Sequence, residues 1–134
     1  MISVDSNIIF SAFDKNDSNH HRAVALISKH AVIEGLVISP VVFAELSASS
    51  VRTQLLQFLE DCKIEIFWDT PDTTWSRAGM AYGDYAKKRL GGVLPRRILA
   101  DFLIGAHAEH HNLKIMTFDT TVYTAVFPQL VLIS

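Results

Sequence analysis

Short apolar runs alternate along the chain with longer stretches that carry apolar residues at helical spacing. Five runs have the length and composition of buried strands: Ile2–Val4, Leu36–Ile38, Ile64–Phe67, Lys114–Thr117 and Leu130–Ile133. The helical stretches between them are Asn7–Phe13, Asn19–Lys29, Val41–Ser47, Val51–Cys62, Thr74–Leu90 and Arg97–Asn112. Because the strand runs are apolar on both faces, the pattern predicts an α/β fold with a parallel sheet covered by helices on both sides.

Several helix boundaries carry local signals. Ser18 is placed to cap the second helix, and Ser39 followed by Pro40 is a typical start for the third. Asn112 is suited to end the long helix that precedes Lys114. The Gly/Pro-rich break at 91–95 is expected to join two helices, and residues 1–134 are expected to form a single domain.

Composition narrows the class of protein. A hydrophobic fraction of 49% excludes a disordered chain, and no apolar run approaches the roughly 18 residues that span a bilayer. The one cysteine, Cys62, cannot form an intrachain disulfide, and the N-terminus lacks a signal-peptide pattern, so a cytoplasmic protein is expected. Only 19% of residues are charged, which favours an apolar face for a partner. Apolar residues of Ala78–Leu90, Met80 and Tyr82 among them, are expected in the core or a dimer interface, and a groove for a partner helix, formed together with Trp75, is the alternative.

Two aspartates directly follow predicted strands. Asp5 follows the first strand, and Asp119 follows the strand that ends near Thr117. Ligands of open α/β sheets bind at the carboxyl ends of the strands, so both carboxylates are expected at one rim. Each one taken alone is better explained as a helix N-cap.

Two further carboxylates interrupt apolar helices. Glu45 lies within Val-Val-Phe-Ala-Glu-Leu and Asp101 within Ile-Leu-Ala-Asp-Phe-Leu-Ile. Burying an ionised carboxylate is costly without a basic partner or a metal. The alternatives are an ion pair between Asp101 and Arg97, and a solvated stripe for Glu45. Gly105 and Ala108 share a face with Asp101, which indicates close helix packing there.

These segments together resemble the PIN-domain ribonucleases, and among them the VapC-type toxins of prokaryotic toxin–antitoxin pairs. The resemblance rests on Val-Asp-Ser-Asn at 4–7, Phe-Ala-Glu-Leu at 43–46, Ala-Asp-Phe-Leu-Ile-Gly-Ala-His-Ala at 100–108 and Met-Thr-Phe-Asp at 116–119. It spans nearly the whole chain, and the four motifs occur in order. The chain departs from the family after Glu45, where a small residue, often Gly, is replaced near 47–49.

The resemblance implies a PIN-like α/β/α sheet of order 3-2-1-4-5, a homodimer and a metal-dependent endoribonuclease that acts as a toxin. It also implies an RNA substrate, a cognate antitoxin and a divalent ion held by Asp5, Glu45, Asp101 and Asp119. A set of carboxylates alone favours Mg²⁺ or Mn²⁺ over Zn²⁺. Supporting hydrogen bonds are expected from Ser6, Asn7 and Thr117, for which turn and cap bonding is an equal alternative.

A net charge of −2 gives no global attraction for a polyanion, so RNA binding requires a local patch or bound cations. Five basic residues fall between positions 87 and 97, and Arg96 and Arg97 are the candidates for contact with phosphate or with an antitoxin. The sequence around His107, His110 and His111 fits no HExxH-type zinc motif, so these residues are expected at the surface or in packing.

Two other functions stay open. A catalytically silent PIN-like module that binds RNA or protein would keep the fold, although the complete carboxylate set argues against it. A doubly wound phosphotransferase would need a second acidic residue near Asp5, and the following Ser6-Asn7 does not supply one.

Overall fold

The computed structural model describes residues 1–134 and contains one sheet of five parallel strands. The strands are β1 (Ile2–Val4), β2 (Leu36–Ile38), β3 (Glu65–Ile66), β4 (Lys114–Met116) and β5 (Leu132–Ile133). Their order is β3-β2-β1-β4-β5, as the resemblance implied. The order of connection therefore reverses between β1 and β4, the central pair, and this is where an open α/β sheet forms a crevice.

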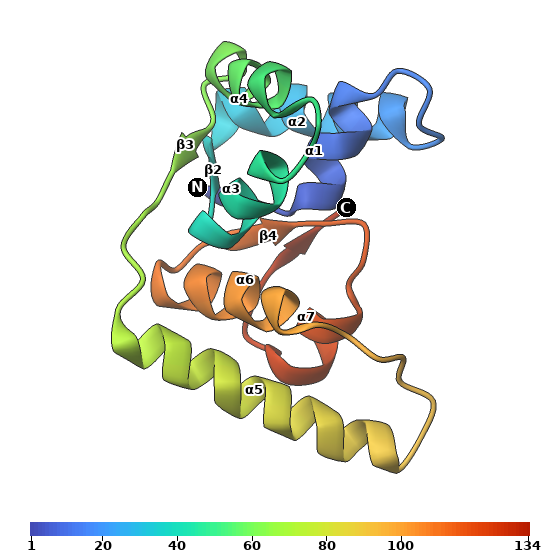
Figure 1. Cartoon of the computed structure of the whole chain (residues 1–134), viewed down its shortest axis with the longest axis vertical. Helices are drawn as coiled ribbons and strands as arrows, with labels where there is room; N and C mark the ends of the chain where they lie inside the picture. Colours follow the sequence, from blue (N-terminus) through green and yellow to red (C-terminus); the bar gives the residue numbers. More distant parts are fainter.

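Seven helices cover the two faces of the sheet. They are α1 (Ser6–Phe13), α2 (His20–Ile33), α3 (Pro40–Ser47), α4 (Arg52–Asp61), α5 (Asp72–Leu90), α6 (Leu99–His110) and α7 (Thr121–Val126). Figure 1 shows α1 to α4 on one side of the sheet and α5 to α7 on the other, with α6 between α5 and the strands. The predicted three-layer arrangement is confirmed.

The predicted elements agree with the observed ones except at a few boundaries. The second helix extends to Ile33 rather than Lys29, and α6 begins at Leu99 rather than Arg97. The strands β3 and β5 are each only two residues long, because they lie at the two edges of the sheet and pair on one side only. Helix α7 was not predicted, since its six residues are too few to display a helical period.

The helix ends follow the local signals with one exception. The hydroxyl of Ser39 accepts a hydrogen bond from the Val42 backbone at 3.2 Å, and Pro40 occupies the first turn of α3 as predicted. Asn112 follows the end of α6 in the left-handed conformation, with φ of 55°. The prediction for Ser18 was wrong: Asn19 is the N-cap of α2, because the chain turns one residue later.

Helix α6 packs closely against its surroundings. Residues 102 to 108 are all buried, including Gly105. A Cβ atom on Gly105 would lie 2.5 Å from the ring of Phe127, so only glycine permits this approach. The close packing expected on the Asp101 face of the helix is therefore observed. No helix combines the length and hydropathy needed to cross a membrane.

Candidate functional site

Asp5 occupies the end of β1 and is almost completely buried, with 6% of its surface exposed. It is the N-cap residue of α1, and Oδ1 accepts a hydrogen bond from the Ser6 backbone at 2.7 Å. The other oxygen accepts bonds from the Thr117 hydroxyl at 2.9 Å and the Tyr123 hydroxyl at 3.1 Å. Asp5 is therefore both a helix cap and a fixed carboxylate at the sheet rim.

The rim of β4 is connected to α1 through a small polar network. The Asn7 amide donates to the Thr117 hydroxyl at 3.2 Å, and the amide oxygen accepts from the Phe118 backbone at 3.2 Å. The hydroxyl of Thr117 also accepts from the Asp119 backbone at 3.1 Å. This network fixes the turn after β4 against the turn after β1, and it holds the side chain that bonds to Asp5.

Glu45 and Asp101 approach the same rim from two helices. Glu45 lies on α3, and Asp101 lies in the first turn of α6. Each is partly buried, and the Oε1 atom of Glu45 is buried without any hydrogen-bond partner. The solvated stripe considered for Glu45 does not describe this environment.

Asp119 is the most exposed of the four carboxylates, and it forms an ion pair. Its Oδ2 lies 2.9 Å from a guanidinium nitrogen of Arg97, and its Oδ1 accepts from the Thr121 backbone at 3.1 Å. The ion pair considered between Arg97 and Asp101 is not formed, because Arg97 precedes the first residue of α6 and its side chain reaches Asp119 instead.

Burial and mutual repulsion set the protonation of the carboxylates. Burial and the charges of Asp5 and Asp119 together raise the pKa of Asp101 to about 6, against a smaller lowering by Arg97. Burial also raises the pKa of Asp5 and of Glu45, and the charge of Asp5 adds to the effect on Glu45. The pKa of Asp119 is lowered, since its hydrogen bonds and Arg97 outweigh its burial. The four carboxylates therefore carry more negative charge than Arg97 neutralises.

Three of these carboxylates and four neighbouring side chains line a cavity of about 90 Å³: Asp5, Ser6, Asn7, Asp101, Asp119, Val122 and Tyr123. Glu45 does not line it but is close enough to Asp5 and Asp101 for their charges to raise its pKa. A hard divalent cation fits this chemistry. It would meet only oxygen donors, it would neutralise the repulsion, and the unpartnered Oε1 of Glu45 would gain a partner.

Tyr123 is a member of the site that the sequence did not indicate. It is fully buried on α7, and burial together with the nearby charges of Asp5 and Asp101 raises its pKa well above the ordinary value. It therefore stays protonated and donates to Asp5. The spacing of four residues from Asp119 was the only available signal, and it has meaning only once α7 is known to be a helix.

The basic residues fall into different environments. Arg96 and Arg97 line a groove of about 480 Å³ beside the start of α6, together with Tyr82, Tyr85, Ala86, Arg89, Ile98 and Leu99. Lys88 donates to the Ala125 carbonyl and so ties α5 to α7. The groove combines positive charge with exposed apolar side chains, and it adjoins the carboxylate cavity through Arg97.

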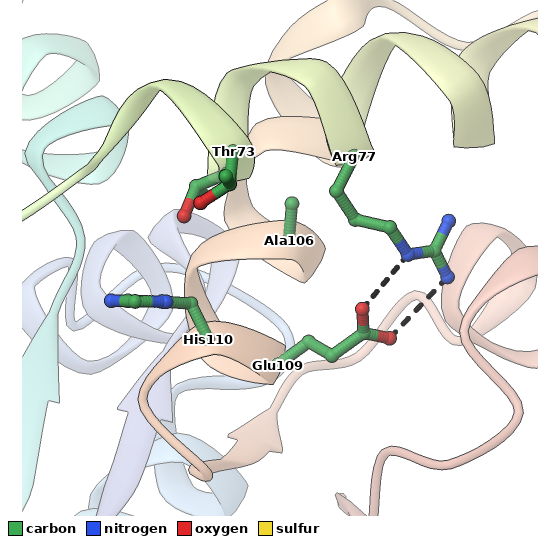
Figure 2. A pocket seen from close by; sticks show the side chains of 6 residues that line it. Thr73, Arg77, Ala106, Glu109 and His110 are labelled. Carbon is green, nitrogen blue, oxygen red and sulfur yellow. Dashed lines mark hydrogen bonds and ion pairs between the residues drawn. The ribbon is translucent and has the colours of Figure 1, made fainter.

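A separate cavity of about 250 Å³ lies between α5 and α6, and Figure 2 shows its lining. The guanidinium of Arg77 bonds both oxygens of Glu109, at 2.8 and 3.3 Å, and also the Val126 carbonyl. Arg77 and Glu109 neutralise each other, so this ion pair fastens α5 to α6 and leaves no free carboxylate in the cavity for chemistry.

Comparisons with known proteins agree with this architecture. The family model of the PIN domain matches residues 2–127. None of the curated proteins matches the sequence.

Similar solved structures include FitAcB from Neisseria gonorrhoeae, with a TM-score of 0.69, 21% identity and coverage of 100% of this chain and 97% of the other. VapBC2 from Rickettsia felis, bound to a DNA fragment from the promoter, has a TM-score of 0.65 at 23% identity, with coverage of 99% of this chain and 98% of the other. VapBC-1 from nontypeable Haemophilus influenzae has a TM-score of 0.63 at 18% identity, with coverage of 100% of this chain and 98% of the other. The TM-scores establish a shared fold, and at these low sequence identities they establish the fold alone.

Proposed function

Because the chain belongs to the PIN domain family, we propose that it is a metal-dependent endoribonuclease that hydrolyses RNA phosphodiester bonds. The observation that carries the proposal is the convergence of four carboxylates with too few positive partners at the carboxyl ends of β1 and β4. An arrangement that raises the pKa of Asp101 to about 6 and leaves a buried Glu45 oxygen unpartnered costs stability unless a cation is bound.

The residues that would hold Mg²⁺ or Mn²⁺ are Asp5, Glu45, Asp101 and Asp119. Such an ion lowers the pKa of a water and neutralises the charge that develops on the phosphate during hydrolysis. Asp5 lies at the centre of the group, since its charge affects the pKa of both Glu45 and Asp101. It is the candidate for the principal ligand.

The polar neighbours would position these ligands. Thr117 and Tyr123 both donate to Oδ2 of Asp5 and so hold that carboxylate in one orientation. Asn7 holds the Thr117 hydroxyl, and Ser6 lies beside Glu45, where it partly offsets the rise in pKa. Loss of a residue in this supporting layer typically costs about 10- to 100-fold in metal affinity or activity.

Arg96 and Arg97 would contact substrate or an inhibitory partner. Arg97 already bonds Asp119, so binding of a cation would free its guanidinium for a phosphate oxygen. Arg96 and Arg89 extend the positive charge along the neighbouring groove. A negatively charged backbone entering the acidic site would meet these three arginines at its edge.

The biological role that we propose is that of a VapC-type toxin paired with an antitoxin. The similar structures named above include VapBC2 and VapBC-1, and a toxin-antitoxin complex from Klebsiella pneumoniae is similar as well. This chain leaves large apolar side chains exposed on α5, with Trp75 at 55%, Met80 at 65% and Tyr82 at 43%. A second copy in a homodimer and an antitoxin in the cytoplasm would cover such surface.

The test is cleavage of purified structured RNAs by the full chain with Mg²⁺ or Mn²⁺. We expect EDTA to abolish cleavage and Asp101→Asn to reduce it at least about a hundredfold. Asp84→Asn, which removes an exposed carboxylate from α5, is the matched control and should retain activity.

Cleavage that survives both EDTA and Asp101→Asn would refute the metal-dependent mechanism. Tight RNA binding by the wild-type chain without cleavage would instead support the catalytically silent module.

A further inference from the structure

A second group of metal-binding side chains lies at the C-terminal end of α6. Asp69, in the connection between β3 and α5, meets His110 and His111, where α6 ends. One carboxylate oxygen and one nitrogen of each imidazole lie within 4.8 Å of one another. Asp69 and His110 are exposed and His111 is partly buried, so solvent ions have access to the group.

Two histidines at the C-terminal end of α6 hold the backbone of residues 67–69 in place. Nε2 of His111 lies 2.8 Å from the Asp69 carbonyl, and Nε2 of His107 lies 2.7 Å from the Phe67 carbonyl. The rings of Phe67 and His111 are also in contact, with centroids 5.4 Å apart. The segment that carries Asp69 is therefore held against α6 before any ligand binds.

The hydrogen bond to the Asp69 carbonyl also selects the tautomer of the His111 ring. A ring nitrogen that donates to a carbonyl carries the proton, which leaves the lone pair of the neutral imidazole on Nδ1. Imidazoles that bind metals commonly have their other nitrogen bonded to a backbone carbonyl in this way. His107, whose ring centroid is 4.5 Å from that of His111, is buried, and its burial lowers its pKa. Its ring is neutral and does not repel a cation.

His110 completes the set. Its Nε2 lies 3.5 Å from Oδ2 of Asp69, too long for a strong hydrogen bond but compatible with two ligands of one ion. Figure 2 shows His110 pointing away from the Arg77–Glu109 pair, which leaves its ring free of that interaction.

We propose that Asp69, His110 and His111 form a transition-metal site of the Zn²⁺ class, which fastens the β3–α5 connection to α6. Two imidazoles and one carboxylate are donors that Zn²⁺, Ni²⁺ or Cu²⁺ accept with water in the remaining position, whereas Mg²⁺ prefers oxygen alone. The site lies at the opposite end of α6 from Asp101, and it does not depend on the nuclease function.

The experiment is calorimetric titration of Zn²⁺ into the full chain with Mg²⁺ in excess, so that the carboxylate site is occupied. We expect His110→Gln and Asp69→Asn to weaken Zn²⁺ binding at least about tenfold. His21→Gln removes an exposed histidine near the start of α2 and should leave the affinity unchanged, as should Asp101→Asn.

A second measurement separates binding from folding defects. Zn²⁺ at about 100 times its dissociation constant should raise the Tm of the wild-type chain by several degrees and that of His110→Gln by much less. Equal Zn²⁺ affinity in the wild type and in His110→Gln, with both proteins folded, would overturn the proposal. So would loss of the Zn²⁺ equivalent in Asp101→Asn, because binding would then be at the carboxylates.

Discussion

The two ends of α6 carry two different groups of polar side chains. At the N-terminal end, Asp101 meets three other carboxylates, and its own burial together with the charges of Asp5 and Asp119 raises its pKa to about 6. At the C-terminal end, His110 and His111 meet a single carboxylate, Asp69. The helix dipole favours acids at the first end and histidines at the second, so each group lies where the backbone assists it.

The difference is in what each group requires to be stable. Like charges at the N-terminal end repel one another, and only Arg97 provides a local positive partner. At the C-terminal end there is only one carboxylate, and His107 and His111 donate to the backbone carbonyls of Phe67 and Asp69. The first group is therefore destabilising without a cation, whereas the second is stable as it stands and would gain only rigidity.

The largest expected effect is on activity, and it should separate the two ends. Glu45→Gln removes one of the four carboxylates and should reduce RNA cleavage at least about a hundredfold, while His110→Gln should leave it within about twofold. Initial cleavage rates at saturating Mg²⁺ measure both. Equal losses in the two variants would mean that the ends are not functionally distinct.

The middle of α6 should be intolerant of added volume. Gly105→Ala places a methyl group 2.5 Å from the Phe127 ring and should lower the free energy of unfolding by about 1–3 kcal/mol. Urea denaturation measures the change. The matched control is Gly79→Ala on α5, where a Cβ atom meets nothing within 4 Å and helix propensity should raise stability by about 0.5–1 kcal/mol. A neutral Gly105→Ala would contradict the packing described for α6.

Positioning by α7 should matter less than the proposed metal ligands themselves. Tyr123→Phe deletes the hydroxyl that donates to Asp5 at 3.1 Å and keeps the ring, so we expect about a tenfold weaker apparent affinity for Mg²⁺. The Mg²⁺ dependence of the cleavage rate measures this, with kcat at saturating Mg²⁺ reduced less. Unchanged Mg²⁺ dependence would show that Thr117 and Ser6 orient Asp5 without help.

The smallest expected effect is on the pH dependence of the stability of the metal-free protein. The pKa of Asp101 is about 6 in the fold and near 3.8 in the unfolded chain, so the wild type loses stability as pH rises from about 4 through about 6. Asp101→Asn lacks this loss and should have a Tm a few degrees higher than wild type at pH 8 in EDTA. The difference should disappear near pH 4, and Mg²⁺ at pH 8 should reduce it. If Asp101→Asn were less stable than wild type at pH 8 in EDTA, the repulsion between Asp101 and the neighbouring carboxylates would be contradicted.

The sequence predicted the sheet well because its strands are short apolar runs, a signal that needs no partner to be visible. Ser39 with Pro40 and the turn at Asn112 were equally local. Helix α7 was missed, and with it Tyr123, because six residues show no period and because the hydroxyl gains its role only from Asp5, 118 positions away. The alternative of an ion pair between Arg97 and Asp101 failed for a similar reason. The spacing suggested a pair within one helix, but α6 begins at Leu99, two residues after Arg97, and the side chain of Arg97 reaches Asp119.

The sequence by itself determined which residues could not be left in an apolar environment: Asp5, Glu45, Asp101 and Asp119, each beside a buried strand or in an apolar helix. Only the tertiary structure decided which side chains share a cavity, which carboxylate Arg97 neutralises, and that Asp69 meets His110 and His111. Local patterns report the cost of burying a single group. The compensation for that cost comes from residues far away in the chain, and their positions are fixed by the packing of α6 against the sheet, α5 and α7.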